Sequence, residues 1–267
     1  MKEVRKYFHN RESALNALLD KPRSKYTVGT FHLLRVELKK LSAVFELLDN
    51  CSTNFNRKKI IKPFKLIFQQ AGRVRELQLE EALLKRHQNN NTLSDHLARL
   101  RKRRLEETNL YFEIVNEEMR HRLKKHFQKI YLSISGVKNK KVLKYLDQMK
   151  QTIHKLIKKE ALEPEQLHKL RIELKMLNYT RKSLGMEQAP NPKTNVLPVL
   201  LGKWHDLEVM SAYLQKTITA EGINRKELVE LRKIVAVMAA NSQILLEKII
   251  KAIPASEFFQ KNYPSAE

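Results

Sequence analysis

Two stretches of similar sequence decide the fold: residues 31–41 read FHLLRVELKKL and residues 167–177 read LHKLRIELKML. They align at a constant offset of 136, and the identical positions are His, Leu, Arg, Glu, Leu, Lys and Leu. A second pair follows in the same order, GRVREL at residues 72–77 and GKWHDL at residues 202–207, at an offset of 130. A repeat that keeps its internal order predicts two related halves built on one plan.

The apolar residues around the first repeat have the period of an α-helix. They recur at alternating steps of three and four, at Phe31, Leu34, Leu38, Leu41, Phe45 and Leu48. A similar pattern near the C-terminus, with Ser242 in its one polar slot, includes Leu228, Leu231, Val235, Met238, Leu245 and Ile249. Such stripes predict helices that bury one face. Six glycines and eight prolines in 267 residues are also too few for a fold of many short strands and tight turns.

We predict an all-α fold with eight helices, at residues 2–20, 30–50, 57–87, 93–135, 139–161, 164–185, 191–220 and 224–252. Each half then holds four helices, and the division falls near Gly136. The expected domains are residues 1–136 and 137–267, as two related four-helix bundles. We expect pseudo-two-fold symmetry between them and a basic groove or channel that they enclose.

The charge balance points to a polyanionic partner. Lys and Arg number 52 against 29 Asp and Glu, which gives a net charge of +23. A hydrophobic content of 42% leaves enough apolar material for a core, so the chain is not a disordered basic tail. The single cysteine, Cys51, fits a reducing compartment, and no signal-peptide or membrane-spanning run is visible. We therefore expect a cytoplasmic protein.

Part of this charge forms two ladders on the repeated helices. His32, Arg35 and Lys39 are spaced by three and four, and the second ladder repeats this spacing at His168, Arg171 and Lys175. Each ladder is displaced by one residue, about 100°, from the neighbouring apolar stripe, so it borders the core. Guanidinium, ammonium and imidazole groups are donors to phosphate oxygens. We predict that the two ladders face each other across one groove that binds phosphate.

The second repeated motif adds candidates and structural residues. Arg75 and His205 precede acidic residues and are predicted to reach the same ligand. Gly72 and Gly202 are expected to allow close packing, and Trp204 is expected in the core or the groove wall. The additional phosphate-binding candidates are Lys40, Arg73, Lys182 and Lys203. For any one of these cations the alternative is a solvated helix face, with pairs such as Glu37 with Lys40.

The sequence does not support a metal site or catalysis. His121 and His126 are five apart, which places them on different sides of a helix, and no His-Glu-x-x-His pair exists. Phosphoryl transfer would need a nucleotide site, and the chain has no Gly-x-x-x-x-Gly-Lys-Ser/Thr loop. We expect no catalytic residues, no metal and no cofactor.

These motifs resemble the CHAD family, the conserved histidine α-helical domain. The similarity rests on the two His-x-x-Arg-x-x-x-Lys segments at His32 and His168, and on residues 201–206, LGKWHD. The resemblance implies two four-helix bundles that enclose a basic channel for inorganic polyphosphate, in many cases within polyphosphate granules, with no catalytic activity. The chain departs from the family pattern at Ser42 and Asn178, where arginine is common, and at Glu76 and Lys182.

The hypothesis is therefore a non-enzymatic polyphosphate-binding module, located in the cytoplasm and at polyphosphate granules. The alternative is a helical nucleic-acid-binding protein that recognises the phosphate backbone. With 7% aromatic residues, and none alternating with the ladders, base stacking is disfavoured. A third interpretation, a scaffold that recruits protein partners, predicts a separate exposed apolar patch, which no stretch of the sequence reveals.

Overall fold

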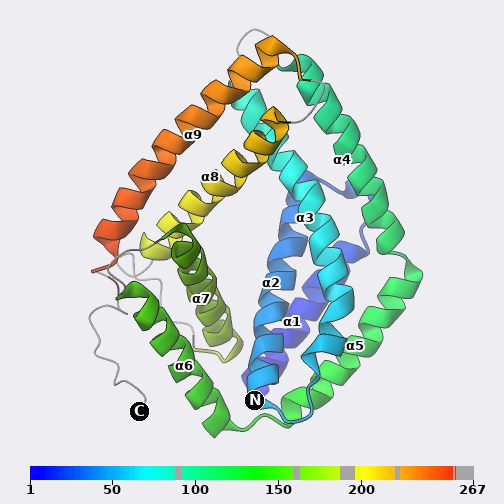
Figure 1. The fold of residues 1–267 in the computed structure, drawn as a ribbon. Helices are drawn as coiled ribbons and strands as arrows, with labels where there is room; N and C mark the ends of the chain where they lie inside the picture. The colour runs from blue at the N-terminus through cyan, green and yellow to red at the C-terminus, as the bar shows by residue number, and fades with distance from the viewer. Residues whose placement is uncertain (88–91, 159–162, 187–195, 220–222, 255, 257–267) are drawn as a thin grey trace. The chain divides into compact units, whose positions relative to one another are not determined.

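A computed structural model describes residues 1–87, 92–158, 163–186, 196–219, 223–254 and 256. Within these residues the chain is all-helical and contains no strand, which confirms the predicted fold class. The α-helices are α1 Lys2–Leu19, α2 Val28–Cys51, α3 Arg57–His87, α4 Ser94–Ile114, α5 Glu117–Ser135, α6 Asn139–Ile157, α7 Pro164–Ser183, α8 Val196–Ile218 and α9 Arg225–Ala252 (Figure 1). A short 3₁₀ helix, Arg23–Lys25, precedes α2.

The prediction of one helix over residues 93–135 was wrong. The described chain has two helices there, because α4 ends at Ile114 and Asn116 caps the start of α5. The Asn116 side chain accepts a hydrogen bond from the Met119 backbone N–H, and Glu117 and Glu118 lie in the first turn of α5. Asparagine followed by acidic residues is a helix-start signal. It was overlooked because no Gly or Pro marks this break.

Several predicted boundaries lie outside the described residues. These are the breaks at residues 89–91, 190–192 and 221–222, the start of the helix expected at 191, and most of the tail from 254 onward. The helix predicted over residues 30–50 runs from Val28 to Cys51, which is buried, so its predicted end differs by one residue.

The described chain forms two compact units, each assembled from three segments. The first comprises Met1–Gln78, Arg101–Asp147 and Asn178–Glu187, and the second comprises Leu79–Leu100, Gln148–Leu177 and Gln188–Glu267. Helices α3, α4, α6 and α7 therefore contribute residues to both units. The division into residues 1–136 and 137–267, which follows the sequence repeat, stays a prediction.

The first unit has an aromatic core. Helix α1 packs on α2 and on α5. Phe8 of α1 lies 5.8 Å from Phe127 of α5, and Phe127 lies 5.3 Å from Phe64 of α3, measured between ring centroids. All six residues of the predicted α2 stripe are buried, which confirms that this face of the helix forms the core.

The second unit is built around α8 and α9, which pack side by side (Figure 1). Trp204 of α8 is 4% exposed and therefore belongs to the core, as predicted. The polar slot in the α9 stripe is also explained, since the buried Ser242 hydroxyl donates to Glu208 Oε1 on α8 at 2.5 Å. The buried stripe of α9 runs through Leu231, Ile234, Met238 and Ile249, whereas the predicted Val235 and Leu245 lie at its border.

Candidate anion-binding site

The first basic ladder lies on α2 and borders the core of the first unit, as its spacing predicts. His32 is exposed, whereas Arg35 and Lys39 are half-buried. Arg35 Nη1 donates to the Phe68 carbonyl oxygen on α3 at 3.0 Å, and its guanidinium lies over the Phe68 ring, 4.2 Å from the centroid. Lys39 Nζ is 5.9 Å from the centroid of the same ring. Phe68 therefore holds two cations of the ladder against α3.

Gly72 makes room for this arrangement. A Cβ atom at residue 72 would lie 2.2 Å from Arg35 Nη1, so any side chain there would displace the guanidinium. Gly202, its counterpart in the repeat, has no atom within 4 Å of the corresponding position. The expected close packing is confirmed at Gly72, where the Arg35 side chain occupies the space that a side chain would need. The same expectation is wrong for Gly202.

The other candidates in the first unit have different surroundings. Lys40 Nζ lies 2.7 Å from Glu37 Oε1, and the same buried carboxylate pairs with Arg11 at 2.9 Å. Lys40 thus belongs to the helix pair that the alternative interpretation predicts. The Arg73 side chain is 62% exposed, with Nη1 4.0 Å from Glu107 Oε2. Arg75, two residues further along α3, is half-buried.

In the second unit, α7 and α8 bring two predicted histidines into contact. His168 Nδ1 lies 3.2 Å from His205 Nδ1, and the ring centroids are 4.7 Å apart. Both side chains are half-buried. The contact joins the first motif of the second half to its second motif, although 37 residues separate them. One ring donates the proton of this hydrogen bond and the other accepts it.

Arg171 and Lys175 continue the same face of α7, where they are half-buried. Burial lowers the pKa of Arg171, and the nearby Asp206 carboxylate opposes this shift. For Lys175, burial and the Arg171 charge lower the pKa, and Asp206 again opposes them. Arg171 Nε is buried and has no hydrogen-bond partner among the described residues. We call His168, Arg171, Lys175 and His205 the basic cluster.

Burial and repulsion between neighbouring cations disfavour the charged forms of groups in the basic cluster. Burial, followed by the charge of Arg171, lowers the pKa of His168. Three groups of the cluster thus have pKa values displaced toward the neutral form, and Asp206 is the carboxylate that acts on two of them. Desolvated cations of this kind gain free energy when an anion reaches them. Chemically, the cluster can therefore bind an oxyanion through several donors.

The remaining two candidates are Lys182 and Lys203. Lys182 is half-buried near the end of α7, in a segment assigned to the first unit. Lys203 is exposed and lines a hollow with residues of α3 and α9.

Sequence reasoning did not identify Phe68 as a neighbour of the ladder. It stands four residues before Gly72, so both lie on one face of α3. That spacing was a usable signal, because a glycine and an aromatic ring on one face form a flat surface for a guanidinium.

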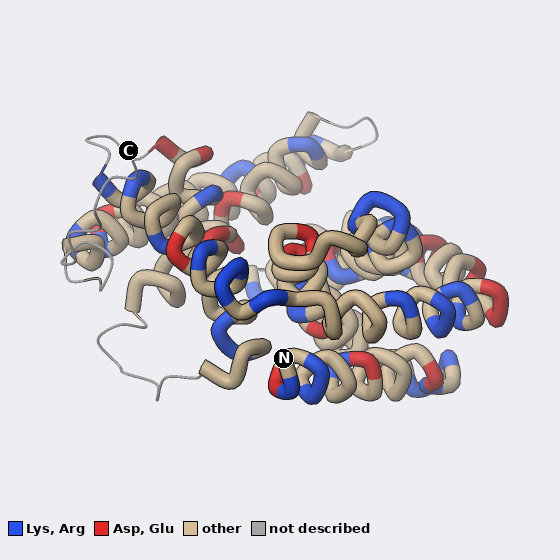
Figure 2. The backbone as a smooth tube through the Cα atoms, turned by 90° about the horizontal axis from the view of Figure 1, so that it is seen from below, with Lys and Arg blue, Asp and Glu red and all other residues tan. Residues whose placement is uncertain are grey.

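The described residues contain no group of three or more His, Cys, Asp and Glu side chains placed to hold a metal ion. Within the same residues, no helix is both long enough and apolar enough to cross a membrane. Basic residues recur along the helices and are not restricted to the ladders (Figure 2).

Comparison with known proteins identifies the family. No curated protein sequence matches the chain. Among solved structures, the CHAD domain from the plant Ricinus communis is similar with a TM-score of 0.73 and 12% identity, over 94% of this chain and 90% of that one. PptA from Streptomyces chartreusis is similar with a TM-score of 0.67 and 11% identity, over 94% and 98%. The sequence itself matches the CHAD domain over residues 12–215, and the chain therefore belongs to the CHAD domain family.

Proposed function

We propose that this protein binds inorganic polyphosphate through its basic ladders. The CHAD family is linked to polyphosphate binding in general. The observation that carries the proposal for this chain is the basic cluster, where burial lowers the pKa values of His168, Arg171 and Lys175. A polyanion is the ligand class that stabilises the charged forms of all three groups.

The donors of the basic cluster suit phosphate oxygens. Arginine offers a planar fork of N–H donors, lysine offers a point charge, and histidine donates from one or both ring nitrogens. The buried Arg171 Nε adds a donor for which the described protein has no acceptor. Phosphate units in series would satisfy several of these donors at once.

The repeat extends the proposal to the first ladder. Arg35 and Lys39 correspond to Arg171 and Lys175, and Phe68 holds them in place on the border of the core. A long polymer has enough phosphate units to contact both ladders, which is the channel that the sequence repeat predicts. We propose binding without a catalytic step, in the cytoplasm and at polyphosphate granules.

Charge reversal tests whether the ladders form the site. The Arg35→Glu/Arg171→Glu variant should bind long-chain polyphosphate at least tenfold more weakly than wild type at 150 mM NaCl. The matched control reverses two exposed lysines, Lys102→Glu/Lys125→Glu. Titration of fluorescein-labelled polyphosphate measures both, and circular dichroism checks that each variant is folded. Equal losses in the two variants would mean diffuse attraction to a protein of charge +23.

Competition separates polyphosphate from nucleic acid. Unlabelled polyphosphate should displace a labelled single-stranded oligonucleotide far better than the oligonucleotide displaces labelled polyphosphate, at matched phosphate concentration. Both complexes should weaken with salt, because each ligand releases condensed counterions on binding. The order of displacement therefore decides between the two: stronger displacement by the oligonucleotide would support the nucleic-acid alternative, and equal displacement in both directions would mean diffuse attraction to any polyanion.

A further inference from the structure

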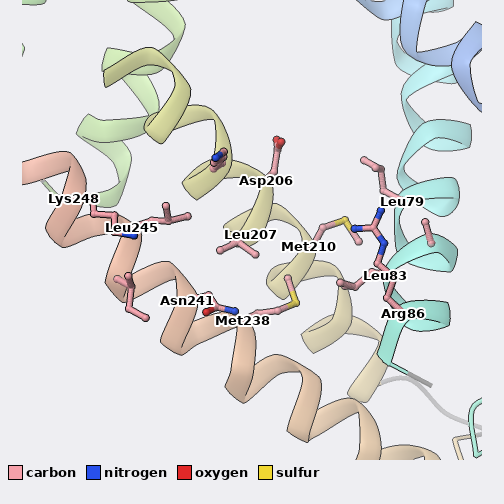
Figure 3. A pocket seen from close by; sticks show the side chains of 13 residues that line it. Leu79, Leu83, Arg86, Asp206, Leu207, Met210, Met238, Asn241, Leu245 and Lys248 are labelled. Carbon is pink, nitrogen blue, oxygen red and sulfur yellow. The ribbon is translucent and has the colours of Figure 1, made fainter. Parts of the chain in front are cut away.

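The second unit contains a hollow of about 540 Å³ whose apolar floor the proposed polyphosphate site does not use. Its walls come from the end of α3, the middle of α8 and the second half of α9 (Figure 3). Helix α9 begins at Arg225, so one wall lies beyond residues 12–215, which match the CHAD domain. The hollow is therefore built partly from a segment outside the family match.

The floor of the hollow is apolar and partly made of methionine. Leu83 of α3, Leu207 and Met210 of α8, and Met238 and Leu245 of α9 line it (Figure 3). Two further lining residues are well exposed for large apolar side chains, Leu79 at 38% and Ile244 at 49%. Methionine adapts its shape to different apolar partners, which suits a binding surface. This is the kind of separate apolar patch that the scaffold interpretation predicts.

Three cations surround this floor on three different helices. Arg86 belongs to α3, Lys203 to α8 and Lys248 to α9, and Asp206 is the one carboxylate in the lining. Figure 3 shows Arg86 and Lys248 on opposite sides of the apolar residues. The rim is thus positive on more than one side, and the expected occupant has an apolar face between acidic edges.

The distribution of charge favours a helix over a small amphiphile. A fatty acid carries its charge at one end and would need cations gathered at one end of the hollow. An amphipathic helix carries acidic residues along both borders of its apolar face. The lining residues of α9 from Met238 to Lys248 span about 15 Å of helix, which matches two to three turns of a partner helix.

We propose that this hollow is a docking groove for an acidic amphipathic helix of a partner protein. The partner presents leucine, isoleucine or methionine at spacings of three and four to the floor. Its aspartate and glutamate residues lie beside Arg86, Lys203 and Lys248. The floor residues are not among the predicted phosphate ligands, whereas Lys203 of the rim is also a phosphate-binding candidate, so variants of the floor distinguish the groove from the polyphosphate site.

A defined peptide library tests the groove on the full chain. The probe is a phage-displayed set of 16-residue peptides, with Leu, Ile, Met or Phe at helical spacing and Asp or Glu on both flanks. Selection in 300 mM NaCl suppresses attraction that depends on net charge alone. Enriched peptides are synthesised with a fluorescein label, and their affinity is measured by anisotropy.

Two pairs of matched variants locate the binding. Ile244→Gln should weaken peptide binding at least fivefold, whereas Val237→Gln should leave it within twofold. Val237 is a suitable control because it lies two turns earlier on α9, is also 49% exposed and does not line the hollow. Lys248→Glu should weaken binding at least threefold, and Lys251→Glu, one turn later on the same helix, should have a smaller effect.

Three results would overturn the proposal. The first is a selection that yields no peptide whose binding depends on Ile244. The second is an equal loss for Ile244→Gln and Val237→Gln. The third is saturable binding of dodecanoate that depends on Ile244 while no peptide binds, which would assign the groove to a small amphiphile. Circular dichroism of each variant shows whether a loss reflects the groove or a folding defect.

Discussion

His168 Nδ1 and His205 Nδ1 lie 3.2 Å apart, so the two rings are joined by a hydrogen bond that only one proton can occupy. Protonation of both Nδ1 atoms would break this hydrogen bond and set one N–H against the other, next to the charge of Arg171. In the free protein, burial and then the charge of Arg171 hold His168 toward its neutral form. An anion at the basic cluster changes this balance, because it accepts a hydrogen bond from the charged His168 ring.

This pair predicts that polyphosphate binding strengthens as the pH falls from 8 to 6. Burial and then Arg171 lower the pKa of His168 in the free protein, and a bound polyanion raises it, so binding takes up protons. Affinity should increase by about three- to tenfold over this range, since one linked proton changes affinity at most tenfold per pH unit. Fluorescence titration at constant ionic strength measures the change.

Two histidine variants identify the residue responsible. His168→Gln should flatten the pH profile. His126→Gln should keep it, although burial and the charges of Lys129 and Arg122 also lower the pKa of His126. His126 lies on α5, which carries none of the predicted phosphate ligands. A wild-type profile that is flat from pH 8 to 6 would remove His168 from the set of phosphate contacts.

Asp206 should limit the affinity of the basic cluster. Its carboxylate favours the charged forms of Arg171 and Lys175, yet it also cancels part of the positive potential that a polyanion meets. Asp206→Asn is therefore expected to tighten polyphosphate binding by about two- to fivefold, with a steeper dependence on salt. The matched control is Glu118→Gln, the same loss of charge at an exposed site on α5. Weaker binding in Asp206→Asn would instead mean that the carboxylate positions Arg171.

Much of the fold follows from the helical spacing of apolar residues, and the one wrongly predicted helix, at residues 93–135, has a physical cause. The six apolar residues of the α2 stripe are all buried, because a stripe at steps of three and four can face only one side. The helix predicted over residues 93–135 is interrupted before α5, whose N-cap is Asn116, and the spacing of the apolar residues does not predict this interruption. The break is indicated by Asn116, because an asparagine side chain can accept a hydrogen bond from the first turn of a following helix without any Gly or Pro nearby.

The sequence predicts which helix faces carry the basic residues of the candidate site, but it does not predict which neighbours their side chains contact. Spacing placed each ladder on one helix face and at the border of the core, as Arg35 and Arg171 show. Spacing does not reveal what a side chain packs against. The repeat therefore suggested equal roles for Gly72 and Gly202, whereas a Cβ atom would meet Arg35 at the first and open space at the second.

This asymmetry predicts opposite outcomes for the same substitution. Gly202→Ala should stabilise the protein by about 0.5–1 kcal/mol, because alanine is favoured over glycine inside a helix and meets no neighbour there. Gly72→Ala should show no such gain, since the new methyl group displaces the Arg35 guanidinium from Phe68. Urea unfolding measures both variants under identical conditions.

Binding gives the second readout of the glycine pair. Gly72→Ala should weaken polyphosphate binding about threefold or more by moving Arg35, and Gly202→Ala should leave it unchanged. The two variants add the same methyl group, so each is the control for the other. Equal gains in stability with unchanged binding in both would show that the position of Arg35 is unimportant for the ladder.

Glu227 should hold the start of α9 in place through a buried network. Its side chain is fully buried, Oε2 accepts from Arg99 Nη2 at 2.8 Å and from the Asn224 backbone N–H at 3.3 Å, and the Asn224 side chain accepts from the Glu227 backbone N–H. Burial by itself raises the pKa of Glu227, but the hydrogen bonds from Arg99 and Asn224 outweigh it, and the pKa is lowered. The ionised form is thus favoured in the folded protein.

A folded-state pKa below the unfolded value contributes stability that is present at neutral pH and is lost as the pH falls through the folded pKa. Glu227→Gln should therefore lower the free energy of unfolding by about 1–3 kcal/mol at pH 7, the range for hydrogen bonds to charged groups, and by less at pH 3. Glu230→Gln, one turn later in an exposed pair with Lys233, should cost below about 0.5 kcal/mol. Urea unfolding at both pH values measures the two variants. A loss for Glu227→Gln that is equally large at pH 3 would mean that shape, and not ionisation, is what the position requires.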